Sequence, residues 1–212
     1  MIIAVDGPAA SGKGTIAKAL ARHFALPHMD TGALYRAVAL NLWRFGGDPD
    51  SEFAAVRACD FAQTDFGDPE LKSEAVGGIA SRISAYPLVR AALIARQQDF
   101  AGQPGGAVLD GRDIGTVIAP QAEAKLFVTA SPEVRARRRL EELLRMGKTV
   151  HFDDVLLDIQ ARDARDGGRE AAPLRMAKDA VLIDTSDMAV DAAIAAAIEA
   201  VKRKRAPTQR TP

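Results

Sequence analysis

The sequence contains little of what marks several classes of protein. Cys59 is the only cysteine, so no disulfide can form within the chain, and a reducing, cytoplasmic compartment is expected. Lys and Arg together number 28, as do Asp and Glu, and this zero net charge argues against nucleic acid as a partner. No apolar run approaches the roughly 20 residues that cross a bilayer, and the N-terminus lacks the basic region of a signal peptide. The sequence therefore predicts a cytoplasmic protein without nucleic-acid or membrane partners.

A glycine-rich motif at the start of the chain is the strongest positive signal. An apolar run over 2–5, typical of a buried strand, is followed by glycines and then by a helical pattern. This order is the context of a phosphate-binding loop, in which backbone N–H groups and the helix N-terminus face an anion and a lysine reaches the β- or γ-phosphate. The predicted ATP-binding residues are Gly7, Pro8, Ala9, Ala10, Ser11, Gly12, Lys13, Gly14 and Thr15.

One position of this loop departs from the usual pattern. Gly14 stands directly after the lysine, where Ser or Thr is expected, and Thr15 follows one residue later. A hydroxyl ligand for magnesium is therefore not expected from the loop. We predict that Mg²⁺ accompanies ATP as a cofactor, held by the nucleotide and water, with no metal ligand from the protein.

The alternation of apolar strands and helical segments predicts an α/β fold. It is the pattern of a doubly wound parallel sheet of P-loop NTPase type, with about five strands and helices on both faces. The predicted strands are 2–5, 107–110, 124–128, 180–183 and a short fifth near 26–29. The predicted helices are 14–24, a second one from Asp30 or Thr31 to the Gly46-Gly47 pair, 52–62, 74–84, 89–100, 131–147, 153–162 and 190–201. We expect a single domain over 1–205 and a flexible tail over 206–212.

Four side chains have structural rather than chemical interpretations. Cys59 is expected to be a small buried hydrophobe, and His28, next to a proline, a structural residue. Trp43 and Phe45 are expected to fill the core beside the second helix.

Several arginines near turn residues narrow the range of reactions that the chain could catalyse. One phosphate loop needs one or two basic partners, whereas two phosphate chains brought end to end need more. Guanidinium groups suit this task because they bind phosphate bidentately and stay charged. Surface ion pairs are the alternative for any single one of them. In the run that starts at Arg162, the Gly167-Gly168 pair favours a mobile loop. The arginines concerned are Arg36, Arg90, Arg112, Arg162, Arg165 and Arg169.

Five segments carry a resemblance to a known family. They are IIAVDGPAASGKGT, DTGALYRAVAL, YPLVR, LDGRDIGT and RDARDGGR, and they extend from residue 2 to residue 169. With these motifs the chain resembles the bacterial cytidylate kinases, which transfer the ATP γ-phosphate to CMP or dCMP in pyrimidine nucleotide metabolism. The resemblance implies a monophosphate-binding segment over about 31–100 and a short lid over about 147–170 within the kinase domain. ATP and CMP or dCMP are the expected partners, and a monomer is expected.

The resemblance also implies a role for individual residues. Lys13, Gly12, Gly14 and Thr15 would hold the donor phosphates, and Arg36, Arg112 and Arg169 the acceptor phosphate. Asp166 would bind the sugar hydroxyls, whereas Ser81, Arg90 and Asp113 would read cytosine. Thr31 stands where the family often has serine and would line the CMP site. Arg162 and Arg165 would close over the transferring phosphoryl group. Apart from the resemblance, Asp110 stands at a predicted strand tip, and the hypothesis that it orients metal-bound water is balanced by a plain capping role. The expected catalytic set is Lys13, Asp110, Arg112, Arg162 and Arg165.

Three alternatives stay open. Asp113 could form only a local ion pair with Arg112 instead of reading the base. The chain could be another monophosphate kinase of the same fold, with UMP, dTMP or AMP as its acceptor. The family also often carries a small β-sheet insertion, for which 61–73 is too short and too polar, and this leaves the base contacts near Ser81 open. The chain could also be a nucleotide-dependent switch or binding module, although it lacks the Asn-Lys-x-Asp motif that would favour one.

Overall fold

The computed structural model describes residues 1–60 and 66–205. Its centre is a five-stranded sheet in the order β2-β3-β1-β4-β5, and every pairing in it is parallel. The strands are β1 (Ile2–Asp6), β2 (His28–Asp30), β3 (Ala107–Gly111), β4 (Ala124–Thr129) and β5 (Val181–Asp184). The predicted α/β fold of P-loop NTPase type is confirmed, including the short strand near 26–29. The predicted tail over 206–212 lies outside the described residues.

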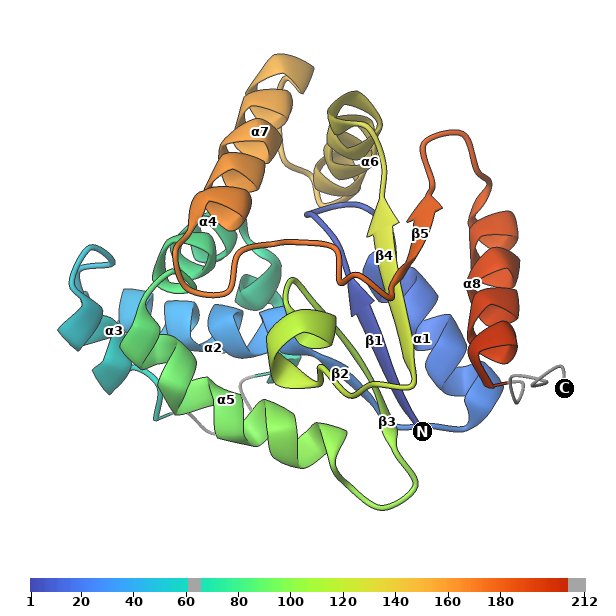
Figure 1. Ribbon diagram of the computed structural model, residues 1–212. Coiled ribbons are helices and arrows are strands. Elements are labelled where there is room, and N and C mark those ends of the chain that lie inside the picture. Colours follow the sequence, from blue (N-terminus) through green and yellow to red (C-terminus); the bar gives the residue numbers. More distant parts are fainter. Residues whose placement is uncertain (61–65, 206–212) are drawn as a thin grey trace, which may run out of the picture.

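Helices cover both faces of this sheet (Figure 1). Helices α1 (Lys13–Phe24) and α8 (Val190–Arg205) pack on one face, where Ile3 and Val5 of β1 belong to the same buried cluster as both helices. On the other face, Ala4 joins a cluster with helix α5 (Pro87–Ala101) and the short helical turn η3 (Ile114–Ile118). Because β1 is covered on both sides, it is apolar at successive positions instead of alternating.

A helical segment lies beside the sheet and has its own apolar cluster. It consists of α2 (Thr31–Arg44), α3 (Glu52–Arg57), the 3₁₀ turn η2 (Pro69–Lys72) and α4 (Glu74–Ile83). Within the described part of 31–101 there is no strand, so no inserted sheet is found there; 61–65 lie outside the described residues. The predicted helix over 52–62 is too long, since α3 ends at Arg57.

The predicted core positions of Trp43 and Phe45 are wrong. Their exposed fractions are 48% and 80%. Helix α2 instead buries Leu34, Val38 and Leu42, which follow one another at four-residue spacing on one face. Trp43 falls off this face, and Phe45 lies beyond the last helical residue, so neither ring can reach the cluster.

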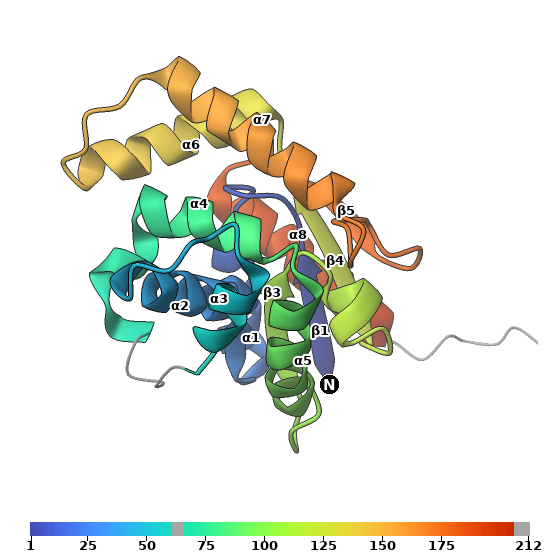
Figure 2. The same ribbon diagram turned by 90° about the vertical axis from the view of Figure 1, so that its left-hand side faces the viewer.

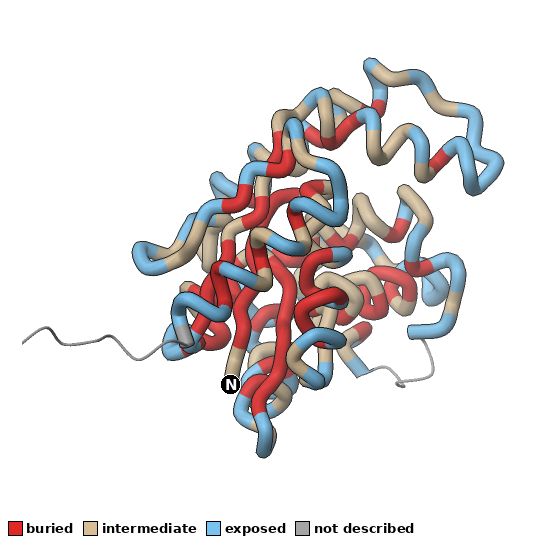
Figure 3. The backbone as a smooth tube through the Cα atoms, turned by 90° about the vertical axis from the view of Figure 1, so that its right-hand side faces the viewer, coloured by how far each residue is buried: buried red, intermediate tan, exposed pale blue. Residues whose placement is uncertain are grey.

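Two antiparallel helices, α6 (Pro132–Arg145) and α7 (Phe152–Gly168), extend over the helical segment (Figure 2). A small buried cluster that includes Leu143 and Ile159 joins them, and the pair is otherwise largely exposed or half-buried (Figure 3). The predicted helix over 153–162 is too short, and the mobile loop at Gly167-Gly168 is wrong because both glycines form the last turn of α7. No described helix combines the length and the hydrophobicity that a membrane crossing requires.

Candidate active site

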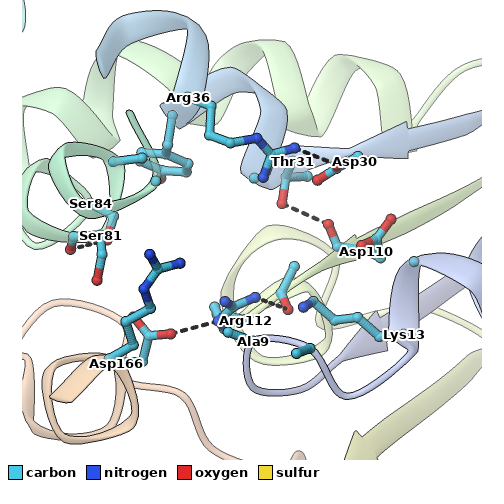
Figure 4. A pocket seen from close by; sticks show the side chains of 18 of the residues that line it. Ala9, Lys13, Asp30, Thr31, Arg36, Ser81, Ser84, Asp110, Arg112 and Asp166 are labelled. Carbon is cyan, nitrogen blue, oxygen red and sulfur yellow. Dashed lines mark hydrogen bonds and ion pairs between the residues drawn. The ribbon is translucent and has the colours of Figure 1, made fainter. Parts of the chain in front are cut away.

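A cavity of about 470 Å³ lies between the phosphate loop, the helical segment and helices α6 and α7 (Figure 4). It collects predicted residues that are far apart in the sequence. Those that line it are Ala9, Ala10, Lys13, Gly14, Thr31, Arg36, Ser81, Arg90, Asp110, Arg112, Asp113, Arg162, Asp166 and Arg169. Six other predicted residues are not among those that line it, namely Gly7, Pro8, Ser11, Gly12, Thr15 and Arg165.

The phosphate loop is shaped by glycines that tolerate no side chain. A Cβ atom on Gly7 would lie 2.0 Å from the Val128 carbonyl oxygen of the neighbouring strand. Gly12 has a left-handed backbone (φ 88°) and precedes α1, whose N-terminus has no side-chain cap. The first N–H groups of α1 are therefore available to an anion.

Lys13 lies at the centre of this loop. Its Nζ donates to the Pro8 carbonyl oxygen (3.1 Å), and within residues 1–60 and 66–205 it forms no ion pair. Burial and the nearby Arg112 lower its pKa to about 7, although Asp110 and Asp30 act in the opposite direction. The site without nucleotide thus disfavours the positive charge that a phosphate would stabilise.

Asp110 is the penultimate residue of β3, near the loop, and is 3% exposed. One of its carboxylate oxygens, Oδ1, accepts a hydrogen bond from His28 Nε2 (2.7 Å), and its carbonyl oxygen accepts one from Thr31 Oγ1 (2.8 Å). The other carboxylate oxygen, Oδ2, lies 3.7 Å from the point where a Cβ atom on Gly14 would be. A carboxylate oxygen therefore lies near the position where most phosphate loops present a hydroxyl.

The residues of the cavity suit a magnesium ion only if the ion is bound to the nucleotide. Among the described residues no group of three His, Cys, Asp or Glu side chains could hold a metal ion. The carboxylate of Asp110 is a hard oxygen donor of the kind that Mg²⁺ and its waters prefer. The geometry therefore suits an ion that is held by phosphates and water and contacted from one side by the protein.

Two arginine–aspartate pairs face one another across the middle of the cavity (Figure 4). Arg36 Nη2 donates to Asp30 Oδ2 (2.7 Å), and Arg112 Nε donates to Asp166 Oδ2 (2.6 Å). Burial alone would raise the pKa of Asp30, but the Arg36 guanidinium outweighs it and holds this pKa below its usual value. Both arginines keep further N–H groups for an anionic ligand.

The end of the cavity that is formed by α4 and α5 holds a buried ion pair. Arg90 pairs with Asp113, and its Nη1 also donates to the Tyr35 hydroxyl (3.2 Å). Arg169 Nη2 lies 3.8 Å from the other oxygen of Asp113. The open alternative, a local ion pair between Arg112 and Asp113, is not observed, because Arg112 pairs with Asp166. Tyr35, which burial shifts to a raised pKa, stays an uncharged donor and acceptor.

The arginines of α6 and α7 contact the helical segment across the cavity. Glu74 at the start of α4 pairs with Arg139, and its Oε2 accepts from Arg162 Nη2 (3.1 Å). Arg162 also lies 2.8 Å from Asp158. Arg165 Nε donates to Ser81 Oγ (3.2 Å). In this conformation Arg162 and Arg165 therefore bind protein groups instead of pointing at the phosphate loop.

Sequence reasoning missed four residues of the site. Glu74 and Arg139 make contacts 65 residues apart in the chain, which no local pattern indicates. Tyr35 lies inside the DTGALYR motif and could have been found there. Asp6, at the tip of β1, accepts from the N–H groups of Ile114 and Gly115 (both 2.8 Å), and burial raises its pKa to about 6. It fixes the turn that follows Asp113.

Cys59 and His28 were both predicted to be structural residues. Cys59 is half-buried, and burial raises the pKa of its thiol to about 11, so it is not an activated nucleophile. His28 was expected to be a structural residue, and its ring makes a hydrogen bond to Asp110, which lines the cavity.

Comparisons with known proteins cover nearly the whole chain. The family model described as cytidylate kinase matches residues 3–203. The cytidylate kinase of Caulobacter sp. (strain K31) is 54% identical over 206 residues, which is 97% of this chain and 95% of the relative. That of Methylocella silvestris is 55% identical over 203 residues, or 95% of this chain and 94% of the relative.

A solved structure shows the same fold at low sequence identity. A protein from Eubacterium ventriosum, described as uncharacterized, has a TM-score of 0.56 and 15% identity, and the match covers 95% of this chain and 98% of that one. This likeness concerns the fold alone. The family match over 3–203 and the relatives at over half identity decide the question: this chain belongs to the cytidylate kinase family.

Proposed function

We propose that the protein transfers the γ-phosphoryl group of ATP to CMP or dCMP and gives ADP and CDP or dCDP. One observation carries the proposal: a single cavity joins a phosphate loop, two arginine–aspartate pairs and a buried Arg90–Asp113 pair, in that order. This is the order of a donor phosphate, an acceptor phosphate with its sugar, and a base. Since all three parts come from one chain, we propose a monomer, acting in the cytoplasm in pyrimidine nucleotide metabolism.

The donor binds at the phosphate loop. The residues from Gly7 to Thr15 surround its β- and γ-phosphates, and Lys13 regains its charge next to them. Magnesium supplies charge neutralisation on these phosphates when it is bound. The protein contributes Asp110, whose carboxylate accepts hydrogen bonds from the waters of that ion.

The acceptor binds along the other half of the cavity. Arg36, Arg112 and Arg169 hold its phosphate, and Asp166 accepts hydrogen bonds from the sugar hydroxyls. Thr31, fixed to the Asp110 backbone, lines the floor between the two nucleotides. The acceptor phosphate oxygen is thereby aimed at the γ-phosphorus of the donor, and no covalent intermediate with the protein is needed.

Base recognition falls to Asp113, Arg90 and Ser81. Cytosine presents an amino donor at the position where uracil presents a carbonyl acceptor. The carboxylate of Asp113 accepts from the first and repels the second, and it is held in place by Arg90. Since a buried acceptor left unpaired is costly, UMP is rejected more strongly than a lost contact alone would imply.

The lid arginines complete the site during transfer. Arg162 leaves Glu74, Arg165 leaves Ser81, and both turn to the transferring phosphoryl group as α6 and α7 close around the nucleotides. They stabilise the charge on its oxygens and help to exclude water.

The test is ADP production from ATP against a panel of nucleoside monophosphates. We expect turnover with CMP and dCMP and little with UMP, dTMP or AMP. The Asp113→Ala variant should lose the preference for CMP over UMP by about 100-fold or more. Asp179→Ala is the matched control, because that carboxylate pairs with Lys125 outside the cavity. Retained preference in Asp113→Ala contradicts the assignment of the base reader, and preference for another monophosphate contradicts the proposed acceptor.

A further inference from the structure

His28, on β2, is linked to the cavity by its hydrogen bond to Asp110. Its Nε2 lies 2.7 Å from Asp110 Oδ1, and the two side chains are 16% and 5% exposed. In the ladder between β2 and β3, His28 lies opposite Val108, and Asp110 lies opposite Asp30. The pair is therefore diagonal across neighbouring strands, and its geometry is set by the sheet.

This contact holds the Asp110 carboxylate in place. Among the described residues no other hydrogen bond reaches either carboxylate oxygen. Oδ1 is occupied by the His28 ring, which leaves Oδ2 toward Gly14 at the start of α1. The two oxygens of Asp110 thus have different tasks because of His28.

A free Asp110 carboxylate would have a competing partner. Lys13 is close enough for its charge to be stabilised by Asp110, yet the two form no ion pair among the described contacts. An aspartate able to rotate would be attracted to this ammonium group and would neutralise it before the nucleotide arrives. The His28 contact holds Asp110 away from that pairing.

We propose that His28 is a positioning residue: its Nε2–H holds Asp110 Oδ1, so that Oδ2 faces the phosphate loop and receives the water shell of nucleotide-bound magnesium. The inference rests on the proposed function, since it specifies how Asp110 acts on Mg²⁺·ATP. It assigns no direct contact with substrate to His28.

The surroundings of His28 allow it to be replaced. Its side chain also lines a second cavity of about 550 Å³, together with apolar residues that include Ala33, Leu34 and Phe100. An apolar side chain can be accommodated there, so His28→Leu removes the donor and leaves Asp110 Oδ1 without its partner, at some cost in stability.

The experiment compares the affinity of the protein for Mg²⁺·ATP with that for ATP in EDTA, by calorimetry. In His28→Leu the ratio of the two affinities should fall about 10-fold, as for other residues that orient a group beside a metal. His28→Gln, whose amide reaches Asp110, should keep the ratio, whereas the shorter His28→Asn should lose it. This polar pair decides the question if the leucine variant does not fold. His23→Leu, at the exposed end of α1, is the matched control and should leave the ratio unchanged.

A double-mutant cycle separates positioning from independent effects. On an Asp110→Asn background, His28→Leu should change the ratio no further, because the group that it positions is gone. In steady state His28→Leu should lower kcat and leave KM for CMP unchanged. An unchanged ratio in His28→Asn, or additive losses in the cycle, overturns the inference. Failure of the native protein to produce CDP from CMP refutes the proposed function instead, and the two results are distinguishable because the binding ratio does not require turnover.

Discussion

Nucleotide binding should be coupled to proton uptake by Lys13. Burial and Arg112 lower its pKa to about 7 in the site without nucleotide. At pH 8 such a group is protonated only about one-tenth of the time. When the phosphates of ATP lie beside it, the pKa returns toward the ordinary lysine value near 10.5 and the group is almost fully protonated. Binding at pH 8 should therefore take up about 0.9 proton per ATP, and at pH 6 only about 0.1.

Calorimetry in buffers with different ionisation enthalpies measures this number directly. The observed binding enthalpy of Mg²⁺·ATP, plotted against the ionisation enthalpy of buffers such as Tris and HEPES, has a slope equal to the protons exchanged. Lys13→Arg is the control, since a guanidinium stays charged at both pH values and should give a slope near zero. Asp6, whose pKa is about 6, is already ionised at pH 8 and contributes little.

The same shift has a signed effect on stability. Because the pKa of Lys13 is lower in the folded protein than in the unfolded chain, the unfolded chain binds more protons between pH 7 and 10.5. The free energy of unfolding without nucleotide should therefore rise with pH across this window. In the calorimetric experiment, a slope near zero for the native protein at pH 8, or an equal slope in Lys13→Arg, would refute the predicted proton uptake by Lys13.

Three further predictions concern groups outside the direct path of transfer. Asp6→Ala leaves two buried N–H groups unpaired and should lower the free energy of unfolding by about 2–4 kcal/mol in urea titrations; a loss under 1 kcal/mol would contradict this. Glu74→Gln weakens a half-buried contact that Arg162 breaks when the lid closes, so fluorescent ATP should dissociate about 5-fold more slowly in stopped-flow experiments, with little change in melting temperature; faster dissociation would contradict this. Gly7→Ala would force a Cβ atom against the Val128 carbonyl and should abolish ATP binding, whereas Gly78→Ala, which meets nothing within 4 Å, should bind normally; normal binding by both would show that the loop can move.

The parts of the fold that the sequence predicts are those with local causes. The apolar run of β1, the glycines of the phosphate loop and the Ser131 cap of α6 each specify their structure within a few residues. The site residues of the three motifs that follow β1, β2 and β3 could be placed in one cavity because parallel strands bring their carboxyl ends to one edge.

The parts that could not be predicted depend on distant contacts. Glycine usually weakens a helix, but Gly167 and Gly168 stay helical at the end of α7, where Asp166 is buried against Arg112. Trp43 has a large apolar ring, yet the face of α2 that packs is decided by Leu34 and its neighbours. The contact of His28 with Asp110 spans 82 residues, and only the strand order reveals it.

The strand order also shows which parts of the site are fixed to each other by the sheet and which lie on helices outside it. In the ladder between β1 and β3, Asp6 pairs with Gly111, so the entrance to the phosphate loop and the Arg112-Asp113 turn are fixed to each other by main-chain bonds. The loop that binds the donor and the turn that binds the acceptor are thus aligned by the sheet itself. Base recognition, in contrast, joins Asp113 of this fixed turn to Ser81 of α4 and Arg90 of α5, which pack largely in a separate apolar cluster. Changes in the packing of α4 and α5 therefore move two of the three base-binding side chains while the machinery for phosphoryl transfer stays in register.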